Sequence, residues 1–287
     1  MKFTELNLEE SVLQALDAMR FEECTPVQEH TIPVILEGKD LIGVAQTGTG
    51  KTAAYLLPVL NQLSKGGYPD DSINCIIMSP TRELAQQIDQ QMEGFSYFMP
   101  ASSVAVYGGN DGIRFEQEKR GLTLGADVVI ATPGRLISHL SLGYVDLSRV
   151  SFFILDEADR MLDMGFYDDI MQIVKFLPKE RQTIMFSATM PAKIQQLAKT
   201  ILNNPVEVKL AVSKPAEKII QTAYVCYENQ KLGIIKDLFK DQQPERVIVF
   251  ASSKLKVKEV TMAFKRLKLN VGEMHSDLEQ AQRDQIM

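Results

Sequence analysis

The first candidate site is a glycine-rich loop between an apolar run that ends at Val44 and a helical pattern. Its residues are Ala45, Gln46, Thr47, Gly48, Thr49, Gly50, Lys51 and Thr52. Glycines let the backbone N–H groups of such a loop converge on a phosphate, and the dipole of the following helix adds to the attraction. Lys51 is placed to reach the β- and γ-phosphates of a nucleotide, and Thr52 offers its hydroxyl to Mg²⁺. Ala45 replaces the first glycine of the strict pattern, but the flanking elements favour a phosphate-binding loop over a chance Gly-Lys-Thr.

A second candidate site is a pair of carboxylates that follows the apolar run Phe152–Leu155. Such a run predicts a buried strand that delivers Asp156 and Glu157 to its carboxyl end, where α/β proteins bind ligands. Asp156 would hold Mg²⁺ through water, and Glu157 would orient or deprotonate the attacking water. By themselves, acidic residues in this position more often begin a helix. Together with the loop, they predict a magnesium-dependent nucleotide site with Lys51, Asp156 and Glu157 as its catalytic residues.

Short apolar runs alternate with helical patterns along most of the chain, and the runs are expected to be strands. They are Asp40–Val44, Cys75–Ser79, Ser103–Tyr107, Asp127–Ala131, Phe152–Asp156, Gln182–Ser187 and Val206–Lys209. Fully apolar strands are typical of a parallel sheet covered on both faces. The helices expected between them include Leu8–Met19, Thr52–Leu63, Arg82–Phe98, Gly134–Leu140 and Ala192–Ile201. This alternation predicts an α/β fold, a doubly wound parallel sheet with helices on both faces.

The composition changes near residue 210, which predicts a boundary between two domains. We expect an ATP-binding domain over 1–209, a linker over 210–218 and part of a second α/β domain over 219–287. The strands expected in the second part are Ile219–Tyr227, Arg246–Ala251 and Val271–His275, and the helices are Lys231–Phe239, Lys254–Leu267 and Glu279–Met287. Three strands would leave a sheet edge open, so we expect this part to be the first half of a domain and the chain to be a fragment.

Composition excludes several classes of protein. A net charge of −6 argues against a protein that coats nucleic acid by bulk electrostatics, so any such contact must be local. Cys24, Cys75 and Cys226 lie far apart, which is typical of reduced thiols and not of a disulfide framework or a zinc site. No apolar run approaches the ~18 residues that a membrane span needs. We therefore expect a cytoplasmic protein without membrane contact.

Several further segments occur in the order typical of one family. They are Phe21–Gln28 (the Q motif, with Phe3 upstream), Pro80–Ala85 (motif Ia), Gly108-Gly109, Thr132–Arg135 (motif Ib), Asp156–Asp159 with the sequence Asp-Glu-Ala-Asp, and Ser187–Thr189 (motif III). With the glycine-rich loop, they resemble a DEAD-box RNA helicase of superfamily 2, of bacterial type. The resemblance covers the whole chain and implies two RecA-like domains, of which the second is partial.

The resemblance implies that ATP, not GTP, occupies the nucleotide site. Gln28 carries a donor and an acceptor that suit the adenine edge. Phe3 would stack on the base, and Phe21 belongs to the same motif. Without the resemblance, Gln28 would be read as a helix cap and Phe3 as packing on the first helix.

The resemblance also implies a site for the RNA backbone. Its candidate residues are Pro80, Thr81, Arg82, Gly108, Gly109, Thr132, Pro133, Gly134 and Arg135. Strand-to-helix junctions expose N–H groups and hydroxyls that hold phosphodiesters without reading sequence. Taken singly, Arg82 and Arg135 would be surface ion-pair residues.

Asp159, Ser187 and Thr189 are implied to couple the ATP site to the RNA site, with the two hydroxyls contacting Asp159. The alternative is that these hydroxyls cap the helix that begins near Pro191. His30 and His139 have no partners in sequence and are expected to be structural.

The segment after residue 218 also resembles the family at Arg246–Phe250 and His275–Arg283, where Ser276 replaces the usual glycine. Motifs V and VI, with which the family completes its ATP site, do not occur in the sequence. Motif VI supplies arginines, and such an arginine finger can be worth ~10³–10⁵ in rate. The chain alone is thus expected to bind ATP as a monomer but to hydrolyse it feebly. Besides a helicase, a clamp that ATP locks onto RNA and an unrelated P-loop NTPase remain open.

Overall fold

A computed structural model describes residues 1–108, 112–210, 219–240 and 245–286. The chain divides into two compact units, Met1–Ser213 and Lys214–Met287, and each is considered by itself. The expected linker at 210–218 lies outside the described residues except for Leu210. Gly109 of the glycine pair also lies outside them.

The first unit is built on a seven-stranded sheet in which every pairing is parallel. Its strands are β1 (Leu41–Val44), β2 (Cys75–Met78), β3 (Ser103–Val106), β4 (Val128–Ala131), β5 (Phe152–Leu155), β6 (Gln182–Ser187) and β7 (Val206–Lys209). The spatial order is β3-β4-β2-β5-β6-β1-β7. All seven predicted strands are confirmed, because apolar runs with turn residues at both ends mark buried parallel strands clearly.

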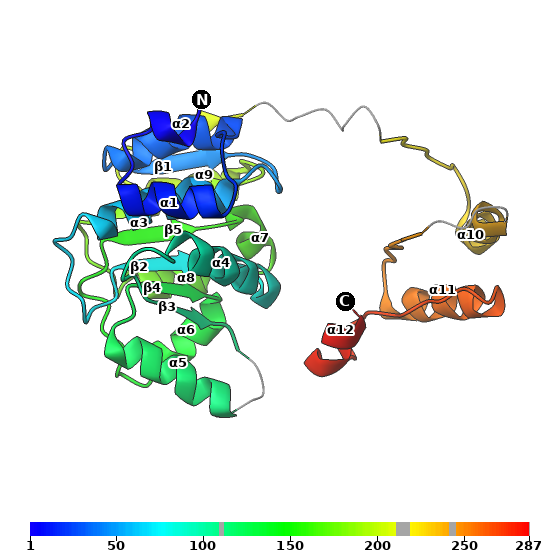
Figure 1. Cartoon of the computed structure of the whole chain (residues 1–287). Helices are drawn as coiled ribbons and strands as arrows, with labels where there is room; N and C mark the ends of the chain where they lie inside the picture. Colours follow the sequence, from blue (N-terminus) through cyan, green and yellow to red (C-terminus); the bar gives the residue numbers. More distant parts are fainter. Residues whose placement is uncertain (109–111, 211–218, 241–244, 287) are drawn as a thin grey trace. The chain divides into compact units, whose positions relative to one another are not determined.

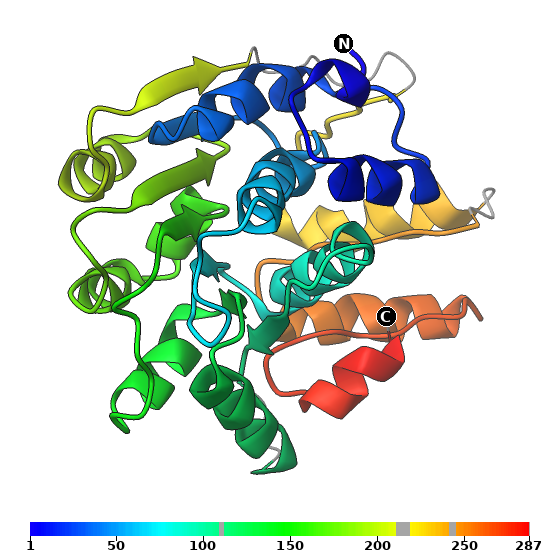
Figure 2. The same ribbon diagram turned by 60° about the vertical axis from the view of Figure 1, so that its left-hand side comes forward.

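Helices cover both faces of this sheet. They are α1 (Glu10–Ala18), α2 (Pro26–Leu36), α3 (Lys51–Ser64), α4 (Arg82–Phe95), α5 (Gly112–Leu124), α6 (Pro133–Leu140), α7 (Ala158–Asp163), α8 (Tyr167–Val174) and α9 (Ala192–Ile201). Helices α1 to α4 contribute to one buried apolar cluster, and α5 to α9 contribute to the other. The two groups differ in colour in Figures 1 and 2, blue to teal for the first and green to yellow-green for the second. The predicted doubly wound α/β fold is therefore confirmed.

The strands of the sheet end within two residues of one another in register, which brings the loops after them to one edge. Val44 of β1 pairs with Ser187 of β6. Leu155 of β5 pairs with Met185 of β6 on one side and with Met78 of β2 on the other. Ala131 pairs with both Met78 and Val106. Because all strands are parallel, the loops after β1, β6, β5, β2, β4 and β3 meet at this carboxyl edge in that spatial order, which is where α/β folds bind ligands.

The second unit contains helices but no strands among its described residues. A short 3₁₀ turn (Glu228–Gln230) precedes α10 (Lys231–Lys240), and α11 (Lys254–Arg266) and α12 (Gln280–Ile286) follow. Phe239 and Phe264 pack edge to face with ring centroids 4.9 Å apart, so α10 and α11 contact each other. The three predicted helices are confirmed.

The three strands predicted in the second unit are wrong for this structure. Residues 219–227, 245–250 and 271–275 are described but belong to no β-ladder. Their apolar side chains are largely exposed, for example Val225 and Phe250. An apolar run becomes a strand only when a neighbouring segment accepts its backbone hydrogen bonds, and no such pairing forms within the described part of this unit.

Candidate functional site

The glycine-rich loop follows β1 and ends at the first residue of α3. Gly48 and Gly50 have φ values of +79° and +89°, a region that only glycine adopts without strain, so the loop turns tightly here. Gly50 is the residue that caps α3, and Lys51 begins the helix. Lys51 is only 6% exposed, and its Nζ has no hydrogen-bond partner among the described residues. A buried ammonium group without a partner is what an anionic ligand would satisfy.

Asp156 lies at the end of β5 and is 2% exposed. Its Oδ1 accepts a hydrogen bond from the Glu157 N–H at 2.9 Å, and its Oδ2 accepts one from the Tyr55 hydroxyl at 3.0 Å. Burial raises the pKa of Asp156 above its ordinary value, and the nearby positive charge of Lys51 partly opposes this rise. The structure thus brings the loop and the carboxylate together around a charged, buried centre.

Tyr55 is a site residue that the sequence did not single out. It lies on α3, is fully buried, and its hydroxyl is hydrogen-bonded to Thr52 as well as to Asp156. Burial and the charge of Asp156 raise its pKa well above the ordinary value, so the hydroxyl keeps its proton and remains a donor. Its position three residues after Thr52, on one helix face, is the only sequence signal that it would turn toward the same site.

The donor set fits Mg²⁺ that is held partly by water and by nucleotide phosphates. Thr52 and Asp156 supply a hydroxyl and a carboxylate, oxygen ligands of the type that Mg²⁺ prefers. No group of three or more His, Cys, Asp or Glu side chains forms a cage within the described residues. A magnesium site needs few protein ligands, because Mg²⁺ dehydrates reluctantly and uses one or two carboxylates plus phosphates.

Glu157 has a left-handed backbone, with φ of 52° and ψ of 50°, where it precedes α7. A residue with a Cβ adopts this conformation only at a cost, and such strain is concentrated at functional sites. Its carboxylate is 12% exposed and pairs with Arg160 at 3.2 Å. With this left-handed backbone the chain leaves the direction of β5 immediately after Asp156. The carboxylates of Asp156 and Glu157 therefore have different surroundings.

Both ends of the Gln28 side-chain amide form hydrogen bonds within the protein. Its Oε1 accepts a hydrogen bond from the Thr25 N–H at 2.8 Å, which is the helix cap that the bare sequence suggested. Its Nε2 donates to the Gly50 carbonyl at 3.0 Å, so it contacts the glycine-rich loop directly. One Nε2 hydrogen and one Oε1 lone pair have no partner among these bonds, and an adenine contact by Gln28 stays a prediction.

Phe3 and Phe21 pack together edge to face at 6.4 Å between ring centroids. Phe3 is 2% exposed, and Phe21 packs in turn on Phe95 of α4. The structure thus places Phe3 in the core, which agrees with the alternative that it packs on the first helix. Base stacking by either ring stays a prediction.

Of the two hydroxyls predicted to contact Asp159, that of Thr189 does so, whereas that of Ser187 is bonded to the Thr189 carbonyl. The Thr189 N–H and hydroxyl donate to Asp159 Oδ2 at 3.0 and 2.8 Å, and the Ser187 hydroxyl donates to the Thr189 carbonyl at 2.8 Å. Burial alone would raise the pKa of Asp159, but hydrogen bonds from the Thr189 side chain and from backbone N–H groups outweigh it and lower the pKa. The capping alternative is not observed, since Pro191 precedes α9 and no side chain caps that helix.

Three of the candidate RNA-binding segments meet beyond β2, β4 and β3. A Cβ built on Gly108 would lie 3.6 Å from Arg82 Nη2 and 3.8 Å from Arg135 Cδ, so residues from the three segments share one place. Thr81 caps α4 by accepting from the Leu84 N–H, and Thr132 precedes α6, whose first residue is Pro133. The predicted grouping of these segments at one sheet edge is confirmed for the described residues.

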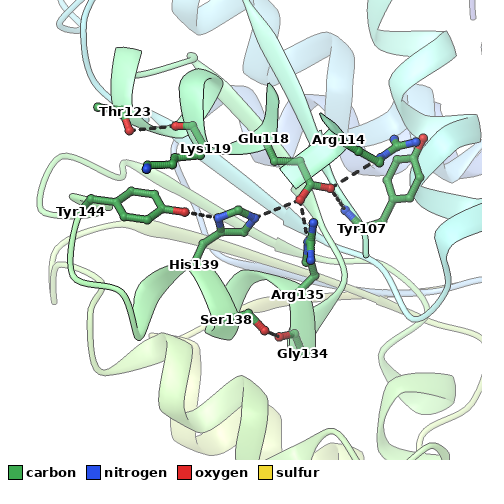
Figure 3. A network of polar contacts seen from close by, with 10 residues as sticks. All are labelled: Tyr107, Arg114, Glu118, Lys119, Thr123, Gly134, Arg135, Ser138, His139 and Tyr144. Carbon is green, nitrogen blue, oxygen red and sulfur yellow. Dashed lines mark hydrogen bonds and ion pairs between the residues drawn. The ribbon is translucent and has the colours of Figure 1, made fainter. Parts of the chain in front are cut away.

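A buried polar network includes Arg135 and lies next to Gly108 (Figure 3). The sequence did not predict it. Glu118 of α5 is 2% exposed and accepts hydrogen bonds from Arg135 and His139 of α6. His139 is fully buried and also contacts the Tyr144 hydroxyl. His139 is therefore a core histidine, as expected, but it has ionic and polar partners.

Replacing Tyr55 by phenylalanine is expected to lower stability by about 1–3 kcal/mol, because it leaves a buried Asp156 oxygen without its donor. The pKa of Asp156 would rise further, since the Tyr55 hydrogen bond holds it down. Urea denaturation measures the first effect. Tyr97→Phe, at a 79% exposed position, is the control and should change stability by less than about 0.5 kcal/mol. Equal stability of the Tyr55→Phe variant and the parent would show that the bond is not formed.

This sheet, with a glycine-rich loop after β1 and a carboxylate after β5, has the architecture of the α/β nucleotide-binding folds. Residues 25–197 match the family model for DEAD/DEAH box helicases, and the chain belongs to this family. No described helix has the length and apolar character required to span a membrane.

Named relatives agree with this assignment. The chain is 39% identical over 287 residues to the ATP-dependent RNA helicase CshA of Listeria monocytogenes, matching all of this chain and 54% of that protein. It is 38% identical to the DEAD-box ATP-dependent RNA helicase CshA of Geobacillus kaustophilus, over 99% of this chain and 60% of the relative. The crystal structure of a DEAD box protein from Methanococcus jannaschii matches with a TM-score of 0.68 and 33% identity, over all of this chain and 76% of that one. The chain thus spans a little over half the length of these curated relatives.

Proposed function

We propose that the chain is the ATP-binding part, with some of the second domain, of an ATP-dependent RNA helicase that separates or remodels short RNA duplexes. The observation that supports this most is the spatial order of the carboxyl edge. The phosphate-binding loop follows β1, and the candidate RNA segments follow β2, β4 and β3. Between them lie β6 and β5, whose loops are joined by the hydrogen bonds from Thr189 to Asp159. A structural change at the ATP site can therefore reach the RNA site through a short path of covalent bonds and hydrogen bonds.

In the proposed mechanism, Lys51 and the N–H groups of the loop bind the β- and γ-phosphates of ATP. Thr52 and Asp156 would hold Mg²⁺, which neutralises charge on the phosphates. Glu157 orients the attacking water and accepts its proton. The buried surroundings of Asp156 and Lys51 exclude water, which strengthens these electrostatic interactions.

RNA would bind through its phosphodiester backbone at the place shared by Gly108, Arg82 and Arg135. Backbone binding carries no sequence information, which suits an enzyme that acts on many duplexes. It also explains how a chain with a net charge of −6 can bind RNA, since only the local cations matter. We further propose that the protein is a monomer of the cytoplasm.

The test is the Mg²⁺-dependent ATPase rate of the complete helicase of which this chain is proposed to be a part, since the chain alone is expected to hydrolyse ATP feebly. The rate is measured with and without single-stranded RNA and with DNA of the same sequence. RNA is expected to raise the rate, and DNA to leave it near the basal level. A helicase also separates a short RNA duplex when ATP is present. Equal stimulation by DNA would contradict the RNA assignment, and RNA binding locked by ATP without strand separation would favour a clamp.

A further inference from the structure

The buried carboxylate of Glu118 connects three parts of the chain beside the candidate RNA site. Oε1 accepts a hydrogen bond from the Tyr107 N–H at the end of β3, at 3.2 Å. Oε2 accepts from Arg135 Nε at 2.6 Å and contacts His139 Nε2 at 2.9 Å, both on α6. Glu118 itself lies on α5, where Arg114 is 3.6 Å from Oε1. Figure 3 shows these partners converging on the one carboxylate.

Glu118 is ionised in this setting. Burial acts to raise its pKa, but hydrogen bonds from His139 and Arg135 and their charges outweigh burial and hold the pKa below its ordinary value. Arg135 is only 15% exposed, and its guanidinium also lies over the Phe115 ring at 4.7 Å. The Arg135 side chain is thus fixed from two sides by α5.

The backbone held by this carboxylate leads directly into the candidate RNA site. Tyr107 immediately precedes Gly108, and Arg135 is both a partner of Glu118 and a neighbour of Gly108. Arg135 Nη2 is buried and has no partner within the described part of the chain, so both of its N–H donors are unused. A single carboxylate therefore fixes the distance between the end of β3 and the first turn of α6.

We propose that Glu118 is a positioning residue for RNA binding, which sets the spacing of the Tyr107–Gly108 backbone and Arg135 so that both reach one strand of phosphates. The inference rests on the proposed function. In this proposal the length of the Glu118 side chain matters, because it spans the distance from α5 to both the end of β3 and α6. The negative charge of Glu118 has the opposite effect, because a carboxylate near a phosphate site repels RNA.

Two substitutions separate reach from charge. Glu118→Asp keeps the charge but is one methylene shorter, so it cannot hold Tyr107 and α6 at their present spacing. Glu118→Gln keeps the length and one acceptor oxygen but loses the charge. If Glu118 acts by positioning, the Asp variant binds RNA roughly tenfold more weakly, the value of one charge-assisted contact, and the Gln variant stays within about threefold of the parent.

The measurement is the fluorescence anisotropy of a labelled single-stranded oligoribonucleotide at fixed salt, with a slowly hydrolysed ATP analogue present. ATP affinity and the thermal midpoint are measured on the same samples, because a purely structural role would change stability without changing RNA affinity. ATP affinity is expected to be the same in parent and variants. RNA affinity unchanged in Glu118→Asp, or lowered in Glu118→Gln as much as in Glu118→Asp, would overturn the proposal.

Asp40→Asn is the matched control. Asp40 is also a buried acid, 7% exposed, and accepts backbone hydrogen bonds from Thr183 at 2.8 Å and Asn203 at 2.6 Å. It precedes β1 and therefore lies at the amino edge of the sheet, away from the candidate RNA site. This variant should lose stability but bind RNA like the parent. A loss of RNA affinity equal to that of Glu118→Asp would assign the effect to general destabilisation and overturn the proposal. A parent protein that binds no RNA would instead refute the proposed function itself.

Discussion

Replacing Lys51 by alanine is expected to weaken ATP binding by roughly 10²–10⁴-fold, because two charge-assisted phosphate contacts are lost at about 1.5–3 kcal/mol each. The Lys51 ammonium is buried, and its Nζ has no hydrogen-bond partner among the described residues, so a nucleotide phosphate would be its natural partner. The loop glycines at 48 and 50 retain their backbone donors in the variant. The loss therefore reports the side chain alone. Titration calorimetry with Mg-ATP measures the affinity directly.

The Lys51→Ala variant has a second expected effect, on Asp156. The positive charge of Lys51 opposes the rise of the Asp156 pKa that burial causes. Removing that charge would raise the pKa of Asp156 further and weaken its ability to hold Mg²⁺. Magnesium dependence should thus shift to higher ion concentrations in whatever residual binding remains.

Lys39→Ala is the control for Lys51→Ala. Lys39 lies just before β1, at the opposite end of the strand that leads into the loop, and it is 56% exposed in a pair with Glu37. Exposed pairs contribute only about 0–1 kcal/mol, so this variant should bind ATP like the parent. Normal ATP affinity in the Lys51→Ala variant would show that Lys51 and its loop do not bind the nucleotide.

The first unit was predictable because its signals are local. Each buried strand is an apolar run bounded by turn residues, and the loop after β1 is recognised from a short segment around Gly50 and Lys51. The order of the strands in the sheet is not local, and it decides which loops become neighbours. The contact between Thr189 and Asp159 could be expected only because the resemblance supplied it.

Glu118 shows why the remaining site residues were missed. It lies within the run Phe115–Arg120, whose glutamates and basic residues are typical of a solvated helix face. Its burial depends on Arg135 and His139, which α6 brings to it from elsewhere in the sequence. Tyr55 was missed for the same reason, since its partner Asp156 comes from another strand. A residue type reveals chemistry only when its partner is also known.

Replacing Glu157 by glutamine is expected to slow ATP turnover by about 10²–10⁴-fold while leaving ATP affinity unchanged. Glutamine has the same length and can accept a hydrogen bond from Arg160, as Glu157 does at 3.2 Å, so the left-handed turn before α7 should persist. It cannot accept a proton from water. The change therefore removes the proposed base and keeps the shape of the site.

The readout for Glu157→Gln is the initial rate of phosphate release at saturating Mg-ATP and RNA, with nucleotide affinity measured in parallel. Glu207→Gln, at a 40% exposed position on the edge strand β7, is the control and should match the parent in both. Asp156 distinguishes the proposed base from the proposed ion ligand. Asp156→Asn should weaken magnesium-dependent ATP binding, whereas Glu157→Gln should lower only the rate. A Glu157→Gln variant with the full rate would mean that another group accepts the proton, and a parallel loss of affinity would place Glu157 among the ligands of the nucleotide or its metal.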